Sequence, residues 1–215
     1  MSNDFLIALL ARMTRRSSIS EEATLASLGL SRSFGLGALR AQLEAQLGRR
    51  LPVLQPNLSV AALRALLATE GAALATAAAD APTEEPAAPV PSGGALPLGL
   101  GMDVQSLDSL PETDDLRAHP VYAGLFTAAE IAGALLKPEP RRHLCGLFCA
   151  KEAAKKAHPL LLNLHPLELE IRHDPAGRPL LQLGEGAPAA ARALRSLVAI
   201  THGKDFSAAT CVVFA

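Results

Sequence analysis

The 215-residue chain carries a formal net charge of −1, three cysteines and no tryptophan. This charge gives no reason to expect nucleic acid or a membrane as a partner, and no apolar run is long enough to span a bilayer. An odd number of cysteines implies no disulfide framework, so Cys145 and Cys149 are expected to be small core residues in a cytoplasmic protein.

A segment rich in proline and alanine, residues 76–97, divides the chain into two unlike parts. Its prolines, glycines and acids cannot form a packed element, which predicts a semi-extended linker. The N-terminal part is residues 1–75 and the C-terminal part is residues 98–215. Each part is close to the size at which a single core can fold alone.

The N-terminal part is predicted to be a small four-helix bundle. Apolar residues recur at helical spacing over residues 3–16 and 33–48, and the second of these stretches closes on a glycine. Residues 20–22 begin a short turn or helix, and an Asn-Leu-Ser cap precedes a last helix over residues 60–68. Nothing in the composition of this bundle suggests catalysis.

The C-terminal part mixes strands with helices, which predicts an α+β domain. A short buried strand is expected over residues 98–104, and the capping-box spacing of Thr127 and Glu130 predicts the start of a helix. A longer helix runs from about residue 141 to residue 157. Period-two alternation and turn residues predict two hairpins, formed by residues 167–173 with 178–183 and by residues 198–202 with 208–214.

The helix over residues 141–157 contains an awkwardly placed carboxylate. At about 100° per residue, Glu152 and Lys156 lie on the same side as Phe148 and Cys149, with Lys151 to one side. An ionised carboxylate on a core-facing side is costly unless it is paired or binds a metal. The alternative is an ordinary i,i+4 pair of Glu152 with Lys156 on a solvated face.

Two further residues extend this pattern: Asp103 ends the glycine-rich strand, and His202 lies at the tip of a later strand. Carboxylates from two separate elements suit Mg²⁺, with phosphate and water completing the coordination shell. Lysines beside such a metal would neutralise a pyrophosphate, as phosphoryl-type transfer requires. Spacing alone leaves open whether these residues meet.

In three motifs that occur in order, the C-terminal part resembles the holo-acyl-carrier-protein synthases, the small 4′-phosphopantetheinyl transferases. The matching stretches are Gly99-Leu-Gly-Met-Asp103, Phe148-Cys-Ala-Lys-Glu-Ala-Ala-Lys-Lys-Ala157 and Ala199-Ile-Thr-His202. The resemblance spans residues 96–215 and implies that family's fold, with coenzyme A as co-substrate. It also implies a homotrimer with sites between subunits.

Carried over residue by residue, the resemblance implies that Asp103 and Glu152 hold Mg²⁺ on the pyrophosphate of coenzyme A. Lys156 would contact the phosphates and stabilise the 3′,5′-ADP leaving group. Lys151 and His202 join Lys156 as the residues expected to bind the cofactor. The implied reaction transfers 4′-phosphopantetheine to a carrier serine in fatty-acid, polyketide or nonribosomal peptide assembly.

The N-terminal part resembles an acyl- or peptidyl-carrier domain over residues 5–70, through Leu25–Leu30 and Leu39–Glu44. In that family an Asp-Ser-Leu triplet opens the second helix, and its serine carries phosphopantetheine. The aligned triplet here is Arg32-Ser33-Phe34. Ser33 is therefore a candidate attachment site for phosphopantetheine, and it is equally a plain N-cap.

The sequence departs from the transferase family in two places. The glycine-rich turn after the lysine motif is absent, because Ala157 runs directly into His158 and a proline. Where the family tends to place an arginine that meets the carrier's acid, this chain has Ser109, next to Asp108. In the carrier-like part, Arg32 stands where the carrier family has an acid. If the positive and negative partners have been exchanged between the two parts, Asp108 is predicted to face Arg32.

Three functions remain open on the sequence. The first is a phosphopantetheinyl transferase acting on an acyl or peptidyl carrier protein. The second is a non-catalytic carrier-binding scaffold, or a detached assembly-line fragment. The enzyme is favoured because the chain retains Asp103, Glu152, Lys156 and His202. The scaffold is favoured because the glycine-rich turn is missing. In the third, the carrier-like part of the same chain is itself modified at Ser33.

Overall fold

The computed structural model describes residues 3–69 and 97–214, so the predicted linker lies almost wholly outside the described residues. The helices are α1 (Asn3–Thr14), α2 (Ser33–Leu47), α3 (Val60–Ala68), α4 (Pro120–Leu125), α5 (Ala128–Leu135), α6 (Pro140–Ala157), α7 (Pro159–Leu162) and α8 (Ala189–Arg192), with 3₁₀ turns η1 (Leu107–Ser109) and η2 (Pro166–Glu168). The strands are β1 (Pro97–Ser106), β2 (Leu169–His173), β3 (Pro179–Leu183), β4 (Arg195–His202) and β5 (Phe206–Phe214).

The N-terminal part has three helices among its described residues, so the predicted four-helix bundle is wrong in its helix count. Glu21 and Glu22 form a turn, and an isolated bridge joins Thr24 to Ser59. The predicted cap is confirmed, because the backbone N–H of Ala62 donates to Ser59 Oγ at 3.1 Å. A cluster of buried leucines from α1, α2, α3 and their connections forms the core of this part.

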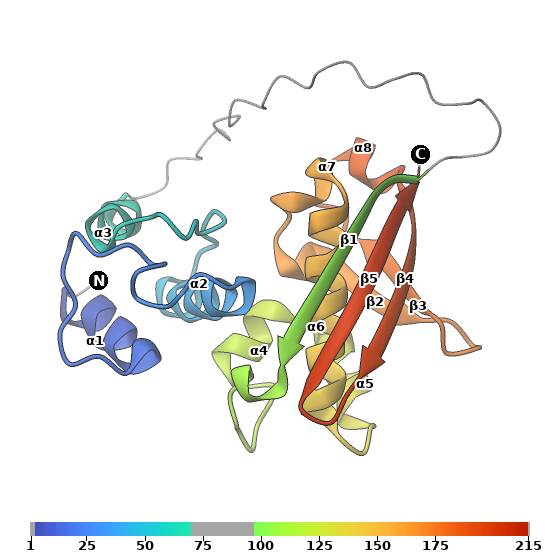
Figure 1. The fold of residues 1–215 in the computed structure, drawn as a ribbon, viewed down its shortest axis with the longest axis horizontal. Helices are drawn as coiled ribbons and strands as arrows, with labels where there is room; N and C mark the ends of the chain where they lie inside the picture. The colour runs from blue at the N-terminus through green and yellow to red at the C-terminus, as the bar shows by residue number, and fades with distance from the viewer. Residues whose placement is uncertain (1–2, 70–96, 215) are drawn as a thin grey trace.

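The C-terminal part is built on a three-stranded antiparallel sheet in the order β1-β5-β4, with α6 packed on one face (Figure 1). The predicted hairpin of β4 with β5 is confirmed, as is the separate hairpin of β2 with β3. The sequence did not indicate the partner of β1. That partner is β5, from the far end of the chain, and Asp103 lies opposite Ala209 in the register.

The glycines of β1 allow this strand to lie directly on α6. A Cβ added at Gly101 would lie 1.9 Å from the carbonyl oxygen of Ala153, and one at Gly99 equally close to that of Ala157. Side chains alternate between the two faces of a strand, so the next position on the helix-facing side is Asp103. The close approach of the two backbones therefore brings the Asp103 carboxylate against the last turns of α6.

The two parts of the chain contact each other along α2, which lies beside α4 (Figure 1). Phe34 of α2 meets Phe148 of α6 edge-to-face, with ring centroids 5.1 Å apart. Farther along α2, Ala41 packs against Gly124 of α4. A Cβ added at Gly124 would lie only 2.5 Å from the Cβ of Ala41. Phe34 consequently belongs to the hydrophobic core of the C-terminal part.

Candidate active site

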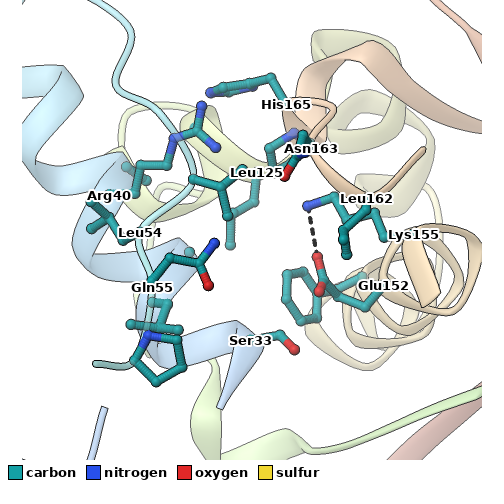
Figure 2. A pocket seen from close by; sticks show the side chains of 18 of the residues that line it. Ser33, Arg40, Leu54, Gln55, Leu125, Glu152, Lys155, Leu162, Asn163 and His165 are labelled. Atoms are coloured by element: carbon teal, nitrogen blue, oxygen red, sulfur yellow. Dashed lines mark hydrogen bonds and ion pairs between the residues drawn. The ribbon is translucent and has the colours of Figure 1, made fainter. Parts of the chain in front are cut away.

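The last turns of α6 carry two lysine–carboxylate pairs. Lys156 Nζ donates to Asp103 Oδ1 on β1 at 2.7 Å. Lys155 Nζ donates to Glu152 Oε1 at 2.9 Å, the pair joined by the dashed line in Figure 2. The alternative prediction, an i,i+4 ion pair between Glu152 and Lys156, is wrong, because each residue pairs with another partner. The structure thus brings Asp103, Glu152 and Lys156 together, as the sequence predicted for a site.

The Asp103 carboxylate is only 8% exposed, and its Oδ2 has no hydrogen-bond partner among the described residues. Burial raises the pKa of Asp103, the bond from Lys156 opposes that rise, and the nearby charge of Glu152 adds to it. A buried carboxylate oxygen without a partner is costly, and a cation placed between the two carboxylates would remove that cost.

These two carboxylates fit Mg²⁺ as a ligand set. Magnesium is commonly bound by one or two protein carboxylates, and water and phosphate oxygens fill the remaining positions. Within residues 3–69 and 97–214 there is no cluster of three or more His, Cys, Asp or Glu side chains that would form a closed metal cage. An open two-carboxylate site leaves room for a phosphorylated substrate.

A pocket of about 270 Å³ opens beside these pairs. One wall is formed by Glu152, Lys155 and Lys156 of α6, and the facing wall includes Ser33 and Arg40 of α2 (Figure 2). Asp103 does not itself line this pocket, and it is connected to it by its bond to Lys156, which does. The predicted catalytic residues therefore lie where the two parts of the chain meet, and the candidate serine lies across from them.

Lys151 lies in the interior, although the sequence predicted it as a cofactor-binding residue. Its side chain is 0% exposed, and its ammonium donates to Glu130 Oε2 at 2.7 Å and to the carbonyl oxygens of Leu125 and Pro166 at 2.8 and 2.9 Å. An ammonium has three donors, and all three are used. Burial lowers the pKa of Lys151, and the charge of Glu130 opposes that shift. This placement supports a structural role in place of contact with coenzyme A.

The structure does not bring His202 to the pocket within one chain. Its ring packs beside Gly146, in the first half of α6, and its Nδ1 lies 2.9 Å from Ser207 Oγ. A separate small cavity contains His202 together with His143 and His173. Partial burial lowers the pKa of His202. A role on the phosphates of coenzyme A would therefore require another copy of the chain.

The hypothesised contact of Asp108 with Arg32 is not formed, since no ion pair joins them in the described part of the chain. Arg32 instead borders a groove that Ser109 and Gln105 also line. The position where the family tends to have an arginine thus presents a small neutral side chain next to Arg32.

Sequence reasoning grouped Lys155 with the lysines that would neutralise a pyrophosphate, but it missed the partners of two residues that organise this region, Lys155 and Glu130. Lys155 holds Glu152, and the signal was available, because residues three apart on a helix are neighbours. Glu130 was identified only as a cap, yet its oxygens also accept from Lys151 and from the backbone N–H of Ile171. No local pattern indicates those partners, which come from distant elements.

None of the helices in the described ranges is both long and apolar enough to cross a bilayer.

Comparison with known proteins places these residues in a family. The model of the 4′-phosphopantetheinyl transferase superfamily, ACPS, matches residues 99–211. The holo-[acyl-carrier-protein] synthase of Solidesulfovibrio magneticus is 39% identical over 120 residues, covering 54% of this chain and 96% of that protein. The synthase of Moorella thermoacetica is 31% identical over 121 residues, covering 54% and 93%. The solved ACPS–CoA complex from Chronobacterium ammoniagenes is 23% identical, with a TM-score of 0.45, and covers 54% of this chain and 96% of that one.

Proposed function

The chain belongs to the 4′-phosphopantetheinyl transferase superfamily, and from that premise we propose that it transfers 4′-phosphopantetheine from coenzyme A to a carrier-protein serine. The products are the modified carrier and 3′,5′-ADP. The curated relatives that it matches are holo-[acyl-carrier-protein] synthases. The observation that carries the proposal is the buried Asp103 carboxylate, whose Oδ2 has no partner among the described residues and whose Oδ1 is bonded to Lys156, which lines an open pocket together with Glu152.

Asp103 and Glu152 are the residues that would hold Mg²⁺. When bound, the ion would supply positive charge to the pyrophosphate of coenzyme A. The free Oδ2 of Asp103 and the mutual repulsion of the two carboxylates support this assignment. Without a cation, this repulsion and the unpaired oxygen destabilise the folded protein, and a bound cation would remove that destabilisation.

Lys156 is the residue placed to stabilise the leaving group. Its side chain is 46% exposed, so its ammonium can reach a phosphate from its position on Asp103. A cation at this point favours departure of 3′,5′-ADP, on which negative charge accumulates. Lys156 thus balances Asp103 in the free protein and the phosphates in the complex.

Glu152 is the residue placed to accept the proton of the attacking serine. Its Oε1 is held by Lys155, and its Oε2 makes no hydrogen bond with other described residues. The serine oxygen bonds to the phosphorus that carries pantetheine, and the bond from that phosphorus to 3′,5′-ADP breaks. The hydroxyl proton passes to Glu152, whose carboxylate is held in position by Lys155.

We further propose that three copies assemble through the open face of the β1-β5-β4 sheet. Large apolar side chains on this face are each more than half exposed: Leu98, Leu100, Met102, Val104 and Leu197. An apolar patch of this kind marks an interaction surface. The family resemblance implies that such an assembly forms sites between subunits, with His202 near the phosphates of coenzyme A.

We place the reaction in the cytoplasm. The three cysteines are free and buried, which fits a compartment that keeps thiols reduced.

The test is transfer to an added acyl carrier protein, measured by intact mass after incubation with coenzyme A and Mg²⁺. The carrier is expected to gain one phosphopantetheine, and Glu152→Gln should abolish most of that gain. Glu185→Gln, at an exposed carboxylate, serves as the matched control. No gain by the carrier, although coenzyme A binds, would favour the non-catalytic scaffold. For the trimer, Leu100→Glu should reduce the mass measured by light scattering to that of one chain.

A further inference from the structure

The N-terminal part of this chain presents a serine to the candidate active site, and we infer that Ser33 is itself an acceptor of phosphopantetheine. The inference rests on the proposed transferase function and adds a substrate to it. The acceptor would be a serine of the same chain, delivered by α2, in addition to any separate carrier protein.

The position of Ser33 carries the first step of the argument. Ser33 is the first residue of α2, and it lines the same pocket as Glu152 and Lys156. Figure 2 shows Ser33 at the lower edge and Glu152 at the right edge of the same opening, one from each part of the chain. A hydroxyl in this position shares a pocket with the carboxylate proposed to take its proton and the lysine proposed to stabilise the leaving group.

The hydroxyl of Ser33 has no structural task. The N-cap of α2 is Arg32, whose side chain makes no capping hydrogen bond, so Ser33 is not the plain N-cap that the sequence also allowed. Its Oγ makes no hydrogen bond with other described residues. A half-buried hydroxyl that neither caps its helix nor bonds a neighbour is available to react.

Contacts along α2 hold Ser33 in place. Phe34, the next residue, packs edge-to-face on Phe148 of α6. Ala41 lies against Gly124, and Glu44 Oε2 lies 3.0 Å from His165 Nε2. The helix is therefore fixed to the transferase part at its start, middle and end, which favours reaction within one molecule.

The chemistry is that of the proposed transfer. The Ser33 oxygen forms a bond to the phosphorus that bears pantetheine, and the bond from that phosphorus to 3′,5′-ADP breaks. The hydroxyl proton passes to Glu152, and 3′,5′-ADP leaves as the second product. Coenzyme A is the only co-reactant consumed, and no oxidant or reductant is needed.

The test uses the full chain freed of any prior modification, incubated with coenzyme A and Mg²⁺, with and without an added acyl carrier protein. Intact mass and peptide mapping are expected to show one phosphopantetheine on the peptide that contains Ser33. Ser33→Ala should lose that gain, whereas Ser31→Ala should keep it, since Ser31 also lines the pocket but is not the assigned acceptor. Circular dichroism of both variants checks that they fold.

Two further measurements define the route. The first-order rate constant of self-modification should not change with protein concentration once the trimer is assembled, because Ser33 is docked on the transferase part of its own chain. Ala41→Leu, which enlarges the side chain that meets Gly124, should slow self-modification by about 100-fold through misplacement of Ser33.

The outcomes separate this inference from the proposed function. Modification of the added carrier with none on Ser33 would overturn the inference and leave the transferase function standing. Modification of neither protein would overturn both. A first-order rate constant of Ser33 modification that rises in proportion to protein concentration, in the range where the chain is fully assembled, would show transfer between molecules and contradict the docked acceptor.

Discussion

Helix α6 carries lysine–carboxylate pairs on two sides, and the two sides differ in how completely their polar groups are satisfied. On the sealed side, Lys151 uses all three of its donors and Glu130 accepts with both of its oxygens. On the open side, Lys156 holds one oxygen of Asp103, while the other has no partner in the part of the chain that the structure describes.

The comparison shows that α6 uses one side for structural contacts and the other side for the candidate active site. A buried pair with every donor and acceptor filled has no capacity for a ligand, so Lys151 and Glu130 link α6 to its neighbours. A buried carboxylate with a free oxygen beside a pocket has unused capacity, which a cation or substrate can take up. Both sides pair a lysine with a carboxylate. Whether such a pair is structural or can bind a ligand depends on how many of its donors and acceptors already have partners within the protein.

The largest expected effect is on the sealed side. Lys151→Met should destabilise the protein by about 3–5 kcal/mol, because it leaves the Glu130 charge buried without its partner. Unfolding in denaturant measures the loss. Lys155→Met is the matched comparison and should cost less, about 1–3 kcal/mol, because the pair is largely buried but its partner Glu152 lines the open pocket. Equal losses in the two variants would remove the distinction between the sides.

On the open side, stability and activity should change in different directions. Asp103→Asn should reduce transfer by about 10²–10³-fold, through loss of the carboxylate charge at the site. Its free energy of unfolding should stay constant or rise, because the substitution removes a buried charge with an unpaired oxygen. Transfer assays and unfolding curves of the same preparation measure both quantities. A stability loss of several kcal/mol with normal transfer would give Asp103 a structural role.

A backbone substitution tests how Asp103 reaches the open side. Gly101→Ala should destabilise the protein by about 1–3 kcal/mol and reduce transfer, because its Cβ would meet the Ala153 carbonyl oxygen at 1.9 Å. Thermal unfolding measures the first effect. Gly133→Ala in α5 is the control, because no atom of residues 3–69 and 97–214 lies within 4 Å of the added Cβ, and it should stabilise the helix by about 0.5–1 kcal/mol.

Local patterns predicted much of the fold. The capping box of Thr127 and Glu130 forms as expected, and so do the Ser59 cap and both C-terminal hairpins. Each of these depends on residues close in sequence. The pairing of β1 with β5 and the helix α4 were not predicted, because the first is a long-range contact and the second is too short for a periodic signal.

The candidate site was predicted in part. Asp103, Glu152 and Lys156 lie together as expected, but the helical periodicity placed Lys151 to one side, and it is the most deeply buried lysine of α6. Periodicity identifies one buried face, whereas α6 is covered by the sheet and by other helices around it. The position of Ser33 across from Glu152 depends on how the two parts of the chain pack, which no local pattern encodes.

The smallest expected effect concerns the contact between Glu44 of α2 and His165 of the C-terminal part, whose Oε2 and Nε2 atoms lie 3.0 Å apart. Burial lowers the pKa of His165, with Glu44 opposing and Arg40 and Arg50 adding to the shift. Burial alone would raise the pKa of Glu44, but the bond from His165, the backbone N–H of Leu51 and Arg40 give a net lowering.

Both shifts have the same consequence for stability. A group whose pKa is lowered on folding binds fewer protons when folded, so its stabilising contribution is lost as the pH falls. The melting temperature should therefore decline from pH 7 toward pH 4, through loss of about 1 kcal/mol or less per group. Glu44→Gln should flatten this decline below about pH 5. A melting temperature that rises on acidification would contradict these assignments.

The measurement that tests the central claim most directly is the rate of phosphopantetheine transfer to an added carrier protein, compared between the wild type and Glu152→Gln at equal free energy of unfolding. Glu152 lies on the open side, so the account predicts a loss of about 10²-fold or more with an unchanged fold. Transfer by Glu152→Gln at the wild-type rate would contradict the claim that the open side of α6 carries the chemistry.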